Sequence, residues 1–337
     1  MSSTGPRLSI IIAAPPKQEV LQSVESLKQL SSQSGFVELI ISRGKMPSIQ
    51  RNVAVKQARG EWLYFLDDDS MVSESSWKRV VEWMNHKDAV VVGGPNLCPA
   101  DSSFIQSLFA LLMGSWLTFG PSRARYLGIG SVRRSTEKEL ILCNLMIRKR
   151  AFEEAGGFDE ALYPNEENAL MESIEKAGGA VYYDPDLQVE RYPRDTLGRF
   201  LFMLYRYGCG RAQQLKRHPG FGSLLNLIPA LFCFHIIVTL MLFGGGLVEP
   251  TSFSGKILLV PLLLYGLAIM FQTVWNFRLF GFLKSLLSAP MMFLCHLLYG
   301  AGIWSGLFHS TSAAASTFKA SDVSLEHRDL SNLRQDS

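Results

Sequence analysis

Three consecutive carboxylates, Asp67, Asp68 and Asp69, directly follow the apolar run 62–66. Adjacent carboxylates repel one another, so the triplet costs stability unless a cation or free exposure to water relieves the repulsion. Oxygen ligands that share an ion with phosphate groups suit Mg²⁺ or Mn²⁺ rather than zinc. The pattern therefore favours a divalent metal site at this triplet over the alternative, a solvated turn.

A second group of acidic residues, the pair Glu166-Glu167, offers a candidate proton acceptor. A carboxylate beside a pocket of low dielectric can be tuned to take the proton of an attacking hydroxyl group. In the alternative interpretation, Glu166, Glu167 and Glu172 form the polar face of a helix over residues 165–177. The residue types alone leave both interpretations open.

The elements that must position these acids alternate between strand and helix. Runs rich in β-branched and aromatic residues, each of strand length, cover residues 8–13, 36–41, 61–66 and 89–92. Apolar residues recur at helical spacing from Val20 to Leu30, and Pro47-Ser48 opens a second helix. This rhythm predicts a doubly wound α/β sheet, whose ligands bind beyond the carboxyl ends of the strands. The Asp triplet stands at such an end.

Long apolar segments without Asp, Glu, Lys or Arg occupy the C-terminal part of the chain at residues 224–248, 257–277 and 285–308. Each exceeds the roughly 20 helical residues that a hydrocarbon layer requires, and buried soluble helices are the weaker alternative. We predict three transmembrane helices here. The shorter apolar stretch at residues 104–119 contains polar residues and is expected to lie in the headgroup layer, with a core helix as the alternative.

Charges beside these segments predict which side of the membrane each part occupies. The basic residues ahead of the first segment are Arg206, Arg211, Lys216 and Arg217. Because Lys and Arg collect on the cytoplasmic side, residues 1–205 are expected to form a cytoplasmic catalytic domain, joined to the spans by a basic connector at 206–223. With three spans, the polar tail at 309–337 would lie on the opposite side, and its composition predicts disorder.

Composition argues against two other classes of protein. The formal charge is only +3 over 337 residues and no long basic run occurs, so the sequence does not indicate nucleic-acid binding. The five cysteines are scattered without CxxC spacing, which argues against a disulfide framework or a structural zinc site.

Two segments resemble a known family. The first, Pro47–Ser70, reads PSIQRNVAVKQARGEWLYFLDDDS and resembles the centre of family 2 glycosyltransferases with the GT-A fold, whose strand ends in the DxD motif. The second, Cys143–Asn168, reads CNLMIRKRAFEEAGGFDEALYPNEEN and resembles the acceptor-side segment of that family. The likeness covers about residues 8–211 and is strongest to membrane-anchored enzymes of bacterial surface-polysaccharide synthesis. It implies a GT-A domain with a nucleotide-binding, Rossmann-like mixed sheet.

The resemblance implies roles for the donor side of the site. Asp67 and Asp69 would form the DxD pair, with Asp69 as the metal ligand and Asp67 nearer the donor sugar or ribose. Asp68 would be the variable middle residue. Arg51 would lie near the donor nucleotide, where the start of its helix offers free backbone N–H groups to phosphate oxygens; the alternative is a surface arginine.

The resemblance also implies roles on the acceptor side. Glu167 takes the position of the general base, one methylene longer than the usual Asp, with Glu166 and Asn144 beside the acceptor. Arg206 and Arg211 fall where many relatives hold the donor diphosphate. Alternatively, these two arginines only form the cytoplasmic charge fringe of the first span.

Two departures from the family pattern limit what the resemblance implies. The second strand ends ISRGKMPS, without the acid that reads the nucleobase and ribose in many members. Ser42, Gly44 and Lys45 are therefore expected to supply backbone or cationic contacts to the donor instead. The QxxRW motif of processive synthases is absent, which favours transfer of a single sugar.

Together these features predict a metal-dependent, inverting hexosyltransferase that uses Mg²⁺ or Mn²⁺. It would move one sugar from a nucleotide-diphosphate sugar to a membrane-associated, polyprenyl-linked acceptor. The expected location is a bacterial inner (plasma) membrane, with the catalytic domain in the cytoplasm. Two alternatives are a synthase of polyprenyl-phosphate sugars and a non-catalytic membrane regulator that binds a nucleotide sugar.

Overall fold

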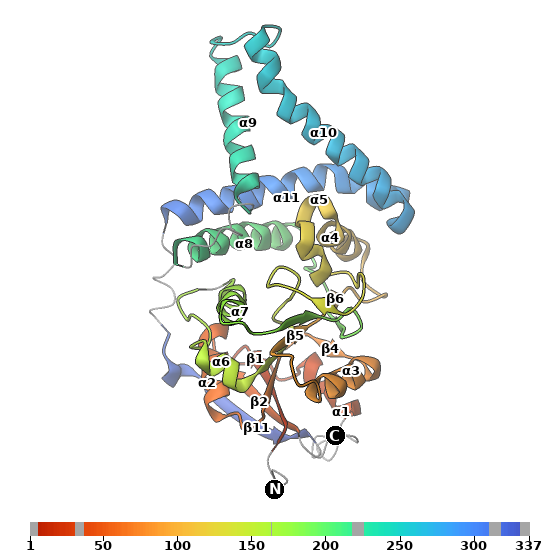
Figure 1. Ribbon diagram of the computed structural model, residues 1–337. Coiled ribbons are helices and arrows are strands. Elements are labelled where there is room, and N and C mark those ends of the chain that lie inside the picture. The colour runs from red at the N-terminus through yellow and green to blue at the C-terminus, as the bar shows by residue number, and fades with distance from the viewer. Residues whose placement is uncertain (1–5, 31–36, 163, 218–225, 310–317, 331–337) are drawn as a thin grey trace. The chain divides into compact units, whose positions relative to one another are not determined.

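The computed structural model describes residues 6–30, 37–162, 164–217, 226–309 and 318–330. The chain divides into two compact units, each of which can be followed by colour in Figure 1. The sheet unit comprises Met1–Ser102, Pro121–Tyr192 and Thr311–Ser337. The helical unit comprises Ser103–Gly120 and Pro193–Ser310.

Three parallel strands form the centre of the sheet unit, namely β1 (Leu8–Ala14), β2 (Val37–Arg43) and β3 (Trp62–Asp67). They confirm the strands predicted from the first three apolar runs. Nearly all their residues are buried, as expected for parallel strands that are covered on both faces. Side chains alternate between the faces, so Ile10 packs into one hydrophobic cluster and its neighbour Ile11 into another.

Helices supply the other half of each cluster. The helices that pack with Ile10 are α1 (Gln22–Leu30) and α3 (Glu74–Met84). Those that pack with Ile11 are α2 (Pro47–Gln57), α6 (Lys149–Glu154) and α7 (Glu166–Lys176). The sheet is therefore covered on both faces, which confirms the predicted doubly wound α/β class.

The complete sheet is mixed, with the strand order β11-β2-β1-β3-β8-β5-β9-β7. Its remaining strands are β5 (Val91–Gly93), β7 (Arg133–Arg134), β8 (Asn144–Arg148), β9 (Val181–Tyr183) and β11 (Ser324–Asp329). β8 runs antiparallel to both β3 and β5. A small second sheet joins β4 (Met71–Val72), β10 (Val189–Glu190) and β6 (Asn96–Leu97). The fourth predicted strand, at 89–92, corresponds to β5.

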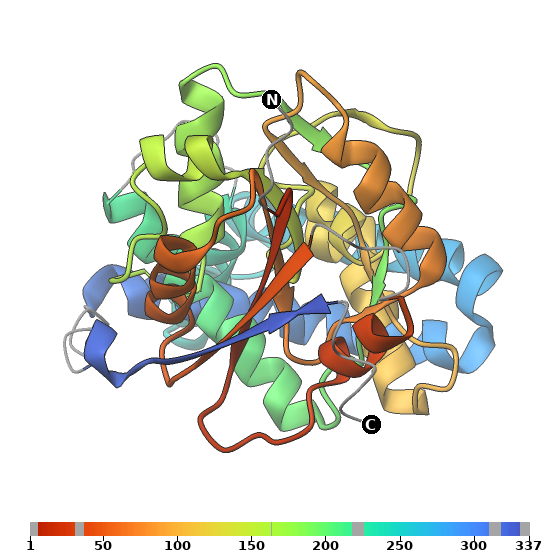
Figure 2. The same cartoon turned by 90° about the horizontal axis from the view of Figure 1, so that it is seen from below.

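The C-terminal tail departs from the expectation of disorder. Within the expected disordered range 309–337, β11 pairs antiparallel with β2 along the edge of the sheet, with Leu325 opposite Ser42 (Figure 2). Leu330, just after the strand, is fully buried in the core. An open sheet edge presents unpaired backbone groups, and β11 satisfies those of β2. Polar composition alone therefore misjudged this part of the tail.

The helical unit contains helices at all three apolar segments. Its long members are α8 (Leu197–Arg217), α9 (Ile228–Gly244), α10 (Phe253–Phe280) and α11 (Phe282–Phe308). By length and composition, α10 and α11 are able to cross a membrane, whereas α9 has 17 residues and is shorter. The same unit includes α4 (Phe104–Gly114) and α5 (Trp116–Phe119), which cover the expected interfacial stretch. The two helical segments within residues 104–125 are bent by 62° relative to each other at the break after α4.

Candidate active site

The Asp triplet lies where the sequence predicted it, at the carboxyl end of β3. Asp67 is the last residue of that strand and pairs with Ala13 of β1. The Ser70 amide closes the following turn by donating to the Asp67 carbonyl at 3.1 Å. The Ser70 hydroxyl donates to the carbonyl of Cys143 at 3.2 Å, which fixes the turn to the neighbouring chain segment. All three Asp side chains are left partly exposed at the edge of the sheet.

The triplet is under the electrostatic strain expected of adjacent carboxylates. Burial, together with the charges of Asp69 and Asp67, raises the pKa of Asp68 above its usual range. Such a cluster binds cations readily, because any positive charge relieves the repulsion.

Arg191 supplies one such positive charge. Its Nη1 lies 2.8 Å from Asp67 Oδ2, and its Nε lies 2.6 Å from Asp69 Oδ1. The residue follows directly after β10, which places its guanidinium across both acids of the DxD pair. Sequence reasoning missed Arg191, because it belongs to no motif and stands more than a hundred residues from the triplet.

Arg51 is a second cation at the site. On α2, its Nη2 donates to Asp67 Oδ1 at 2.8 Å and its Nη1 donates to Glu166 Oε1 at 3.1 Å. Its side chain is only 6% exposed, which excludes the alternative of a surface arginine. The two acidic motifs, predicted separately, therefore lie on either side of one guanidinium.

Glu166 and Glu167 begin helix α7. The preceding residue, Asn165, adopts a left-handed conformation with φ 88°, which turns the chain sharply into the helix. Asn168 donates to Asn165 Oδ1 at 2.9 Å and holds this turn. The first turn of a helix favours negative charge, because its backbone N–H groups carry partial positive charge. Glu166 is buried and Glu167 is half-buried.

The two glutamates differ in their surroundings. Burial and the neighbouring charge of Glu167 raise the pKa of Glu166 to about 8, an effect that Arg51 only partly offsets. Glu166 Oε2 has no hydrogen-bond partner among the residues that the structure describes, so this oxygen is the one that can carry a proton. Glu166 therefore suits a neutral, positioning role, and the role of Glu167 as the base stays a prediction.

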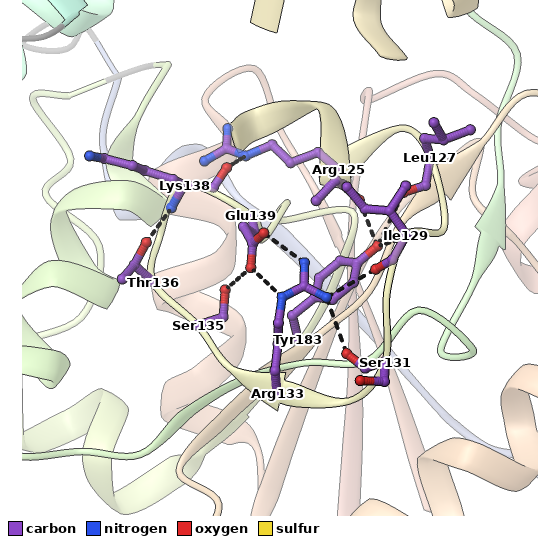
Figure 3. Close-up of polar contacts among 11 residues, drawn as sticks. Arg125, Leu127, Ile129, Ser131, Arg133, Ser135, Thr136, Lys138, Glu139 and Tyr183 are labelled. Carbon is purple, nitrogen blue, oxygen red and sulfur yellow. Dashed lines mark hydrogen bonds and ion pairs between the residues drawn. The ribbon is translucent and has the colours of Figure 1, made fainter. Parts of the chain in front are cut away.

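A partly buried polar cluster orders the loop next to α7 (Figure 3). Arg133 binds Glu139 through both carboxylate oxygens, at 2.6 and 3.1 Å, and lies over the ring of Tyr183. Arg125 donates to the Lys138 carbonyl at 2.9 Å and to Asn168 Oδ1 at 2.7 Å. Through Asn168, the loop is tied to the turn that presents the two glutamates. The polar groups of this cluster form hydrogen bonds within the protein, so we assign the cluster a structural role.

The structure places Ser42 and Gly44 where β2 meets α2. The Ser42 hydroxyl is fully buried and donates to the Gln50 carbonyl at 2.8 Å, while Gln50 Nε2 donates back to the Ser42 carbonyl at 2.6 Å. A Cβ at Gly44 would meet Gln50 Cγ at 2.9 Å. Both residues therefore join the end of β2 to α2, the helix that carries Arg51, and a contact of their backbone with a donor stays a prediction. Lys45 is exposed.

The structure corrects the expectation for Asn144. Its side chain is fully buried, accepts a hydrogen bond from the Tyr64 hydroxyl at 2.8 Å and donates to the Leu187 carbonyl at 2.6 Å. A buried amide with both ends bonded is a structural element, because breaking those bonds would leave polar groups unsatisfied. Asn144 therefore joins strands and loops and does not contact an acceptor.

Arg206 and Arg211 lie in the helical unit, on α8. Arg206 is exposed, whereas Arg211 is 8% exposed and donates to Gln214 Oε1 at 3.0 Å. Arg211 Nε and Gln214 Nε2 have no hydrogen-bond partner among the described residues. A buried donor without a partner is costly. Arg211 is therefore the better candidate of the two for an anionic ligand.

The acids fit a metal that is shared with a ligand better than a metal held by protein alone. Asp67 and Asp69 provide hard oxygen atoms of the kind that Mg²⁺ and Mn²⁺ prefer. Within the described ranges, no three His, Cys, Asp or Glu side chains converge as a metal cage. Mg²⁺ commonly binds through one or two carboxylates together with substrate phosphates. Two aspartates at the carboxyl end of β3 match that arrangement.

The fold and the site define a class of protein. A mixed α/β sheet with paired aspartates after its third strand and an acidic helix start beside them is the arrangement of a GT-A glycosyltransferase. The profile of "Glycosyl transferase family 2" matches residues 19–156. Residues 19–156 of the chain thus form a glycosyl transferase family 2 domain, as the sequence motifs predicted.

Known proteins support this assignment. The chain is 25% identical over 264 residues to "Succinoglycan biosynthesis protein ExoA" of Rhizobium meliloti, which covers 77% of this chain and 74% of that protein. Among solved structures, it is similar to the mannosyltransferase PcManGT of Pyrobaculum calidifontis in complex with GDP-Man and Mn²⁺. That match has a TM-score of 0.56 and 13% identity, and covers 91% of this chain and 88% of that one. It shows that the two proteins share a fold.

A weaker likeness, with a TM-score of 0.38 and 14% identity, connects the chain to GalNAc-T7 with UDP, GalNAc and Mn²⁺. It covers 57% of this chain and 45% of that one.

Proposed function

We propose that the chain is a metal-dependent, inverting glycosyltransferase that moves a single sugar from a nucleotide-diphosphate sugar to a polyprenyl-linked acceptor. The observation that carries this proposal is the position of Arg51 between Asp67 and Glu166, at 2.8 and 3.1 Å. A donor-binding acid and an acceptor-side acid share one guanidinium, so donor and acceptor can meet within a single site.

The donor side holds the diphosphate. A Mg²⁺ or Mn²⁺ ion held by Asp69 and Asp67 would neutralise charge on the departing nucleoside diphosphate. Arg51 and Arg191 lie on the same acids and supply fixed positive charge next to the phosphates. Asp67 is bonded to both arginines, and we assign it the position nearest the donor sugar.

The acceptor side removes a proton. Glu167 at the start of α7 takes the proton of the acceptor hydroxyl while its oxygen forms the new bond to the anomeric carbon. The bond from that carbon to the diphosphate oxygen breaks at the same time, and the nucleoside diphosphate leaves with the electron pair. Attack from the face opposite the leaving group inverts the anomeric configuration. Glu166, whose pKa is raised to about 8, keeps a proton and avoids adding a second negative charge beside the base.

The membrane-associated acceptor is supported by the rest of the chain. Two helices, α10 and α11, are long and apolar enough to cross a membrane. The relative ExoA is, by its name, a succinoglycan biosynthesis protein. An enzyme held at a bacterial inner membrane, with its sheet unit in the cytoplasm, would meet a lipid-linked acceptor there. Arg211 on α8 is a candidate contact for a phosphate group of such substrates.

The proposal is tested with the purified full-length protein. Nucleotide sugars are screened for thermal stabilisation with and without Mn²⁺, since a ligand that binds only the folded state raises its apparent stability. The stabilising donor is then incubated with polyprenyl-phosphate and polyprenyl-diphosphate-sugar acceptors, and the lipid products are weighed by mass spectrometry. A product enlarged by one sugar on the diphosphate-linked lipid supports the proposal.

The same assay separates the alternatives. A polyprenyl-phosphate sugar as the product would identify the synthase instead. Stabilisation by a donor that stays intact with every acceptor would favour the non-catalytic regulator. Asp69→Ala should abolish both metal-dependent stabilisation and transfer, whereas Asp88→Ala, at an exposed position of the same unit, should change neither.

A further inference from the structure

The C-terminal strand decides whether the chain crosses a membrane an even or an odd number of times. β11 pairs with β2 over six residues, from Ser324 opposite Arg43 to Asp329 opposite Glu38. Strand pairing requires backbone atoms within about 3 Å, whereas a hydrocarbon layer is about 30 Å thick. Both strands therefore lie on the same side of any membrane. Between residues 43 and 324 the chain crosses an even number of times.

The apolar stretch at 104–119 does not contribute a single crossing. Asp67 precedes it and Glu166 follows it, yet both bond to Arg51. The ends of this stretch therefore lie on one side, in agreement with the 62° bend that follows α4. The segments 218–225 and 310–317 lie outside the described residues and have eight residues each, well below the roughly 20 that a span requires. Of the three apolar helices α9, α10 and α11, either two cross a membrane or none does.

Both ends of α11 lie on the side of the sheet unit. Near its start, Lys284 Nζ lies 5.7 Å from the centre of the Phe104 ring, and Phe104 is separated from the sheet unit by only one residue. At its other end, Phe308 is followed after fifteen residues by Ser324, the first residue of β11. A helix whose two ends lie on the same side does not cross.

α11 also packs closely along a helix that cannot enter hydrocarbon. A Cβ at Gly302 would overlap the Tyr205 carbonyl, and one at Gly306 would come within 2.6 Å of the Cys209 carbonyl, so the two backbones of α8 and α11 touch. Small residues permit such contact between helices. The Tyr205 hydroxyl donates to Ser305 Oγ at 2.7 Å, and further along, Lys216 donates to the Leu307 carbonyl.

The charges of α8 decide where this pair of helices lies. Its exposed basic residues are Arg199, Arg206, Lys216 and Arg217. Charged groups are costly in the hydrocarbon core but are stable in the headgroup layer, where apolar side chains can still reach inward. The face of α11 away from α8 offers such side chains, among them Phe282, Leu286 and Phe293. The pair therefore suits the membrane surface.

The remaining two helices have the character of a spanning hairpin. The start of α9 contacts α11, because Trp304 Nε1 donates to the Ala230 carbonyl at 2.9 Å. A single residue separates the end of α10 from the start of α11. α9 carries apolar residues on all sides, which is typical of a span and not of a surface helix. At about 1.5 Å per residue its 17 residues reach about 25 Å, at the short end of the range for spans. The link between α9 and α10 carries a single charged residue, Glu249.

We propose that α9 and α10 form a two-pass membrane hairpin, with the link at residues 245–252 on the far side. α8 and α11 lie in the headgroup layer on the side of the sheet unit, and β11 returns to complete the catalytic sheet. The occupant of the apolar surface of these helices is thus the lipid bilayer. This arrangement corrects the expectation of three spans with the tail on the opposite side, and it does not depend on the proposed reaction.

The proposal is tested by labelling introduced cysteines in the full-length protein, in sealed membrane vesicles, with a maleimide that does not cross lipid. Ser75→Cys on α3 reports the side of the sheet unit, Thr251→Cys reports the α9–α10 link, and Ser321→Cys reports the tail; all three positions are exposed. The wild-type chain gives the background from its five native cysteines. Asp329→Cys is a second, exposed tail position in case Ser321→Cys fails to fold.

The expected result is labelling of Ser75→Cys and Ser321→Cys from one side and of Thr251→Cys only from the other. Labelling of both tail positions from the side opposite Ser75→Cys would mean an odd number of crossings and would overturn the proposal. Labelling of Thr251→Cys from the same side as Ser75→Cys would also overturn it, because the crossing pair would then be α10 and α11, or no helix would cross. Every outcome decides the question.

Discussion

The guanidinium of Arg51 bonds to Glu166 Oε1 at 3.1 Å, although 115 residues separate the two in the chain. The same group bonds to Asp67 at 2.8 Å, so it connects the acid after β3 with the acid at the start of α7. Removing it would leave Glu166 without this hydrogen-bond donor and Asp67 without one of its two arginine partners.

Arg51→Gln is therefore expected to damage both folding and function. A hydrogen bond to a charged group contributes about 1.5–3 kcal/mol, and Arg51 donates one to Asp67 and one to the buried Glu166. We expect a clear drop in the thermal midpoint and loss of donor stabilisation. Arg150→Gln is the matched control, since Arg150 is 89% exposed and pairs with Glu154 on the same helix. Wild-type stability in Arg51→Gln would contradict the bridging role.

The raised pKa of Glu166 predicts a specific dependence of thermal stability on pH. Its pKa is raised from 4.5 to about 8 in the folded chain. A carboxyl group with a raised folded pKa contributes its full stabilisation below 4.5, and this is lost as the pH rises through about 8. Wild-type protein should therefore lose thermal stability between these values relative to Glu166→Gln, which carries no titrating group. Glu153→Gln, on the exposed side of α6, should follow the wild type, and parallel curves for wild type and Glu166→Gln would refute the assignment.

The sequence was sufficient to predict the core of the fold and much of the site. Apolar runs of strand length located β1, β2 and β3, and the Asp triplet followed the third because ligands bind at carboxyl ends of such strands. β11 escaped prediction because its sequence, SLEHRD, has only one apolar residue. An edge strand gains its stability from backbone pairing with a partner far away in the chain, and composition does not report that.

Two further site residues show why the rest was not predictable. Asn144 stands inside a family-like segment, but the face of the strand on which a side chain lies depends on its neighbours, and its neighbours bury it. Arg191 forms ion pairs with both Asp67 and Asp69, yet only the folded chain brings it to them. Motif reading finds residues that are close in sequence, and it has no access to contacts created by distant loops.

Arg191 is expected to compete with the metal. Its guanidinium lies on both acids of the DxD pair, so a divalent ion must displace it or share the acids with it. Arg191→Gln should therefore bind Mn²⁺ alone more tightly, by about tenfold or ~1.4 kcal/mol, measured by electron paramagnetic resonance of free Mn²⁺. Donor stabilisation in the presence of Mn²⁺ should weaken, since a phosphate contact is lost. Arg199→Gln, an exposed arginine on α8, serves as the control. Unchanged Mn²⁺ affinity would show that Arg191 does not occupy the place of the ion.

Glu167→Gln should separate chemistry from binding. If Glu167 takes the proton of the acceptor, its loss should lower kcat by about 10²–10⁴-fold with little effect on donor stabilisation. Glu167→Asp, which restores the side chain usual in the family, should retain activity. Glu175→Gln on the exposed part of α7 is the control. Equal losses in kcat for Glu167→Gln and Glu175→Gln, or full activity of Glu167→Gln, would remove the base from its proposed role.

Gly302 tests the contact between α8 and α11. A side chain there would overlap the carbonyl of Tyr205, and because backbone cannot yield as a flexible side chain does, the helices must separate. Overpacking of this kind typically costs about 1–3 kcal/mol, so Gly302→Val should lower the thermal midpoint of the protein in detergent. Gly266→Val on α10 is the matched control, since a Cβ at Gly266 has no atom within 4 Å. If both variants unfolded at the same temperature, the close approach of the two helices would carry no stability, and α11 would lose the contact that holds it beside the charged helix.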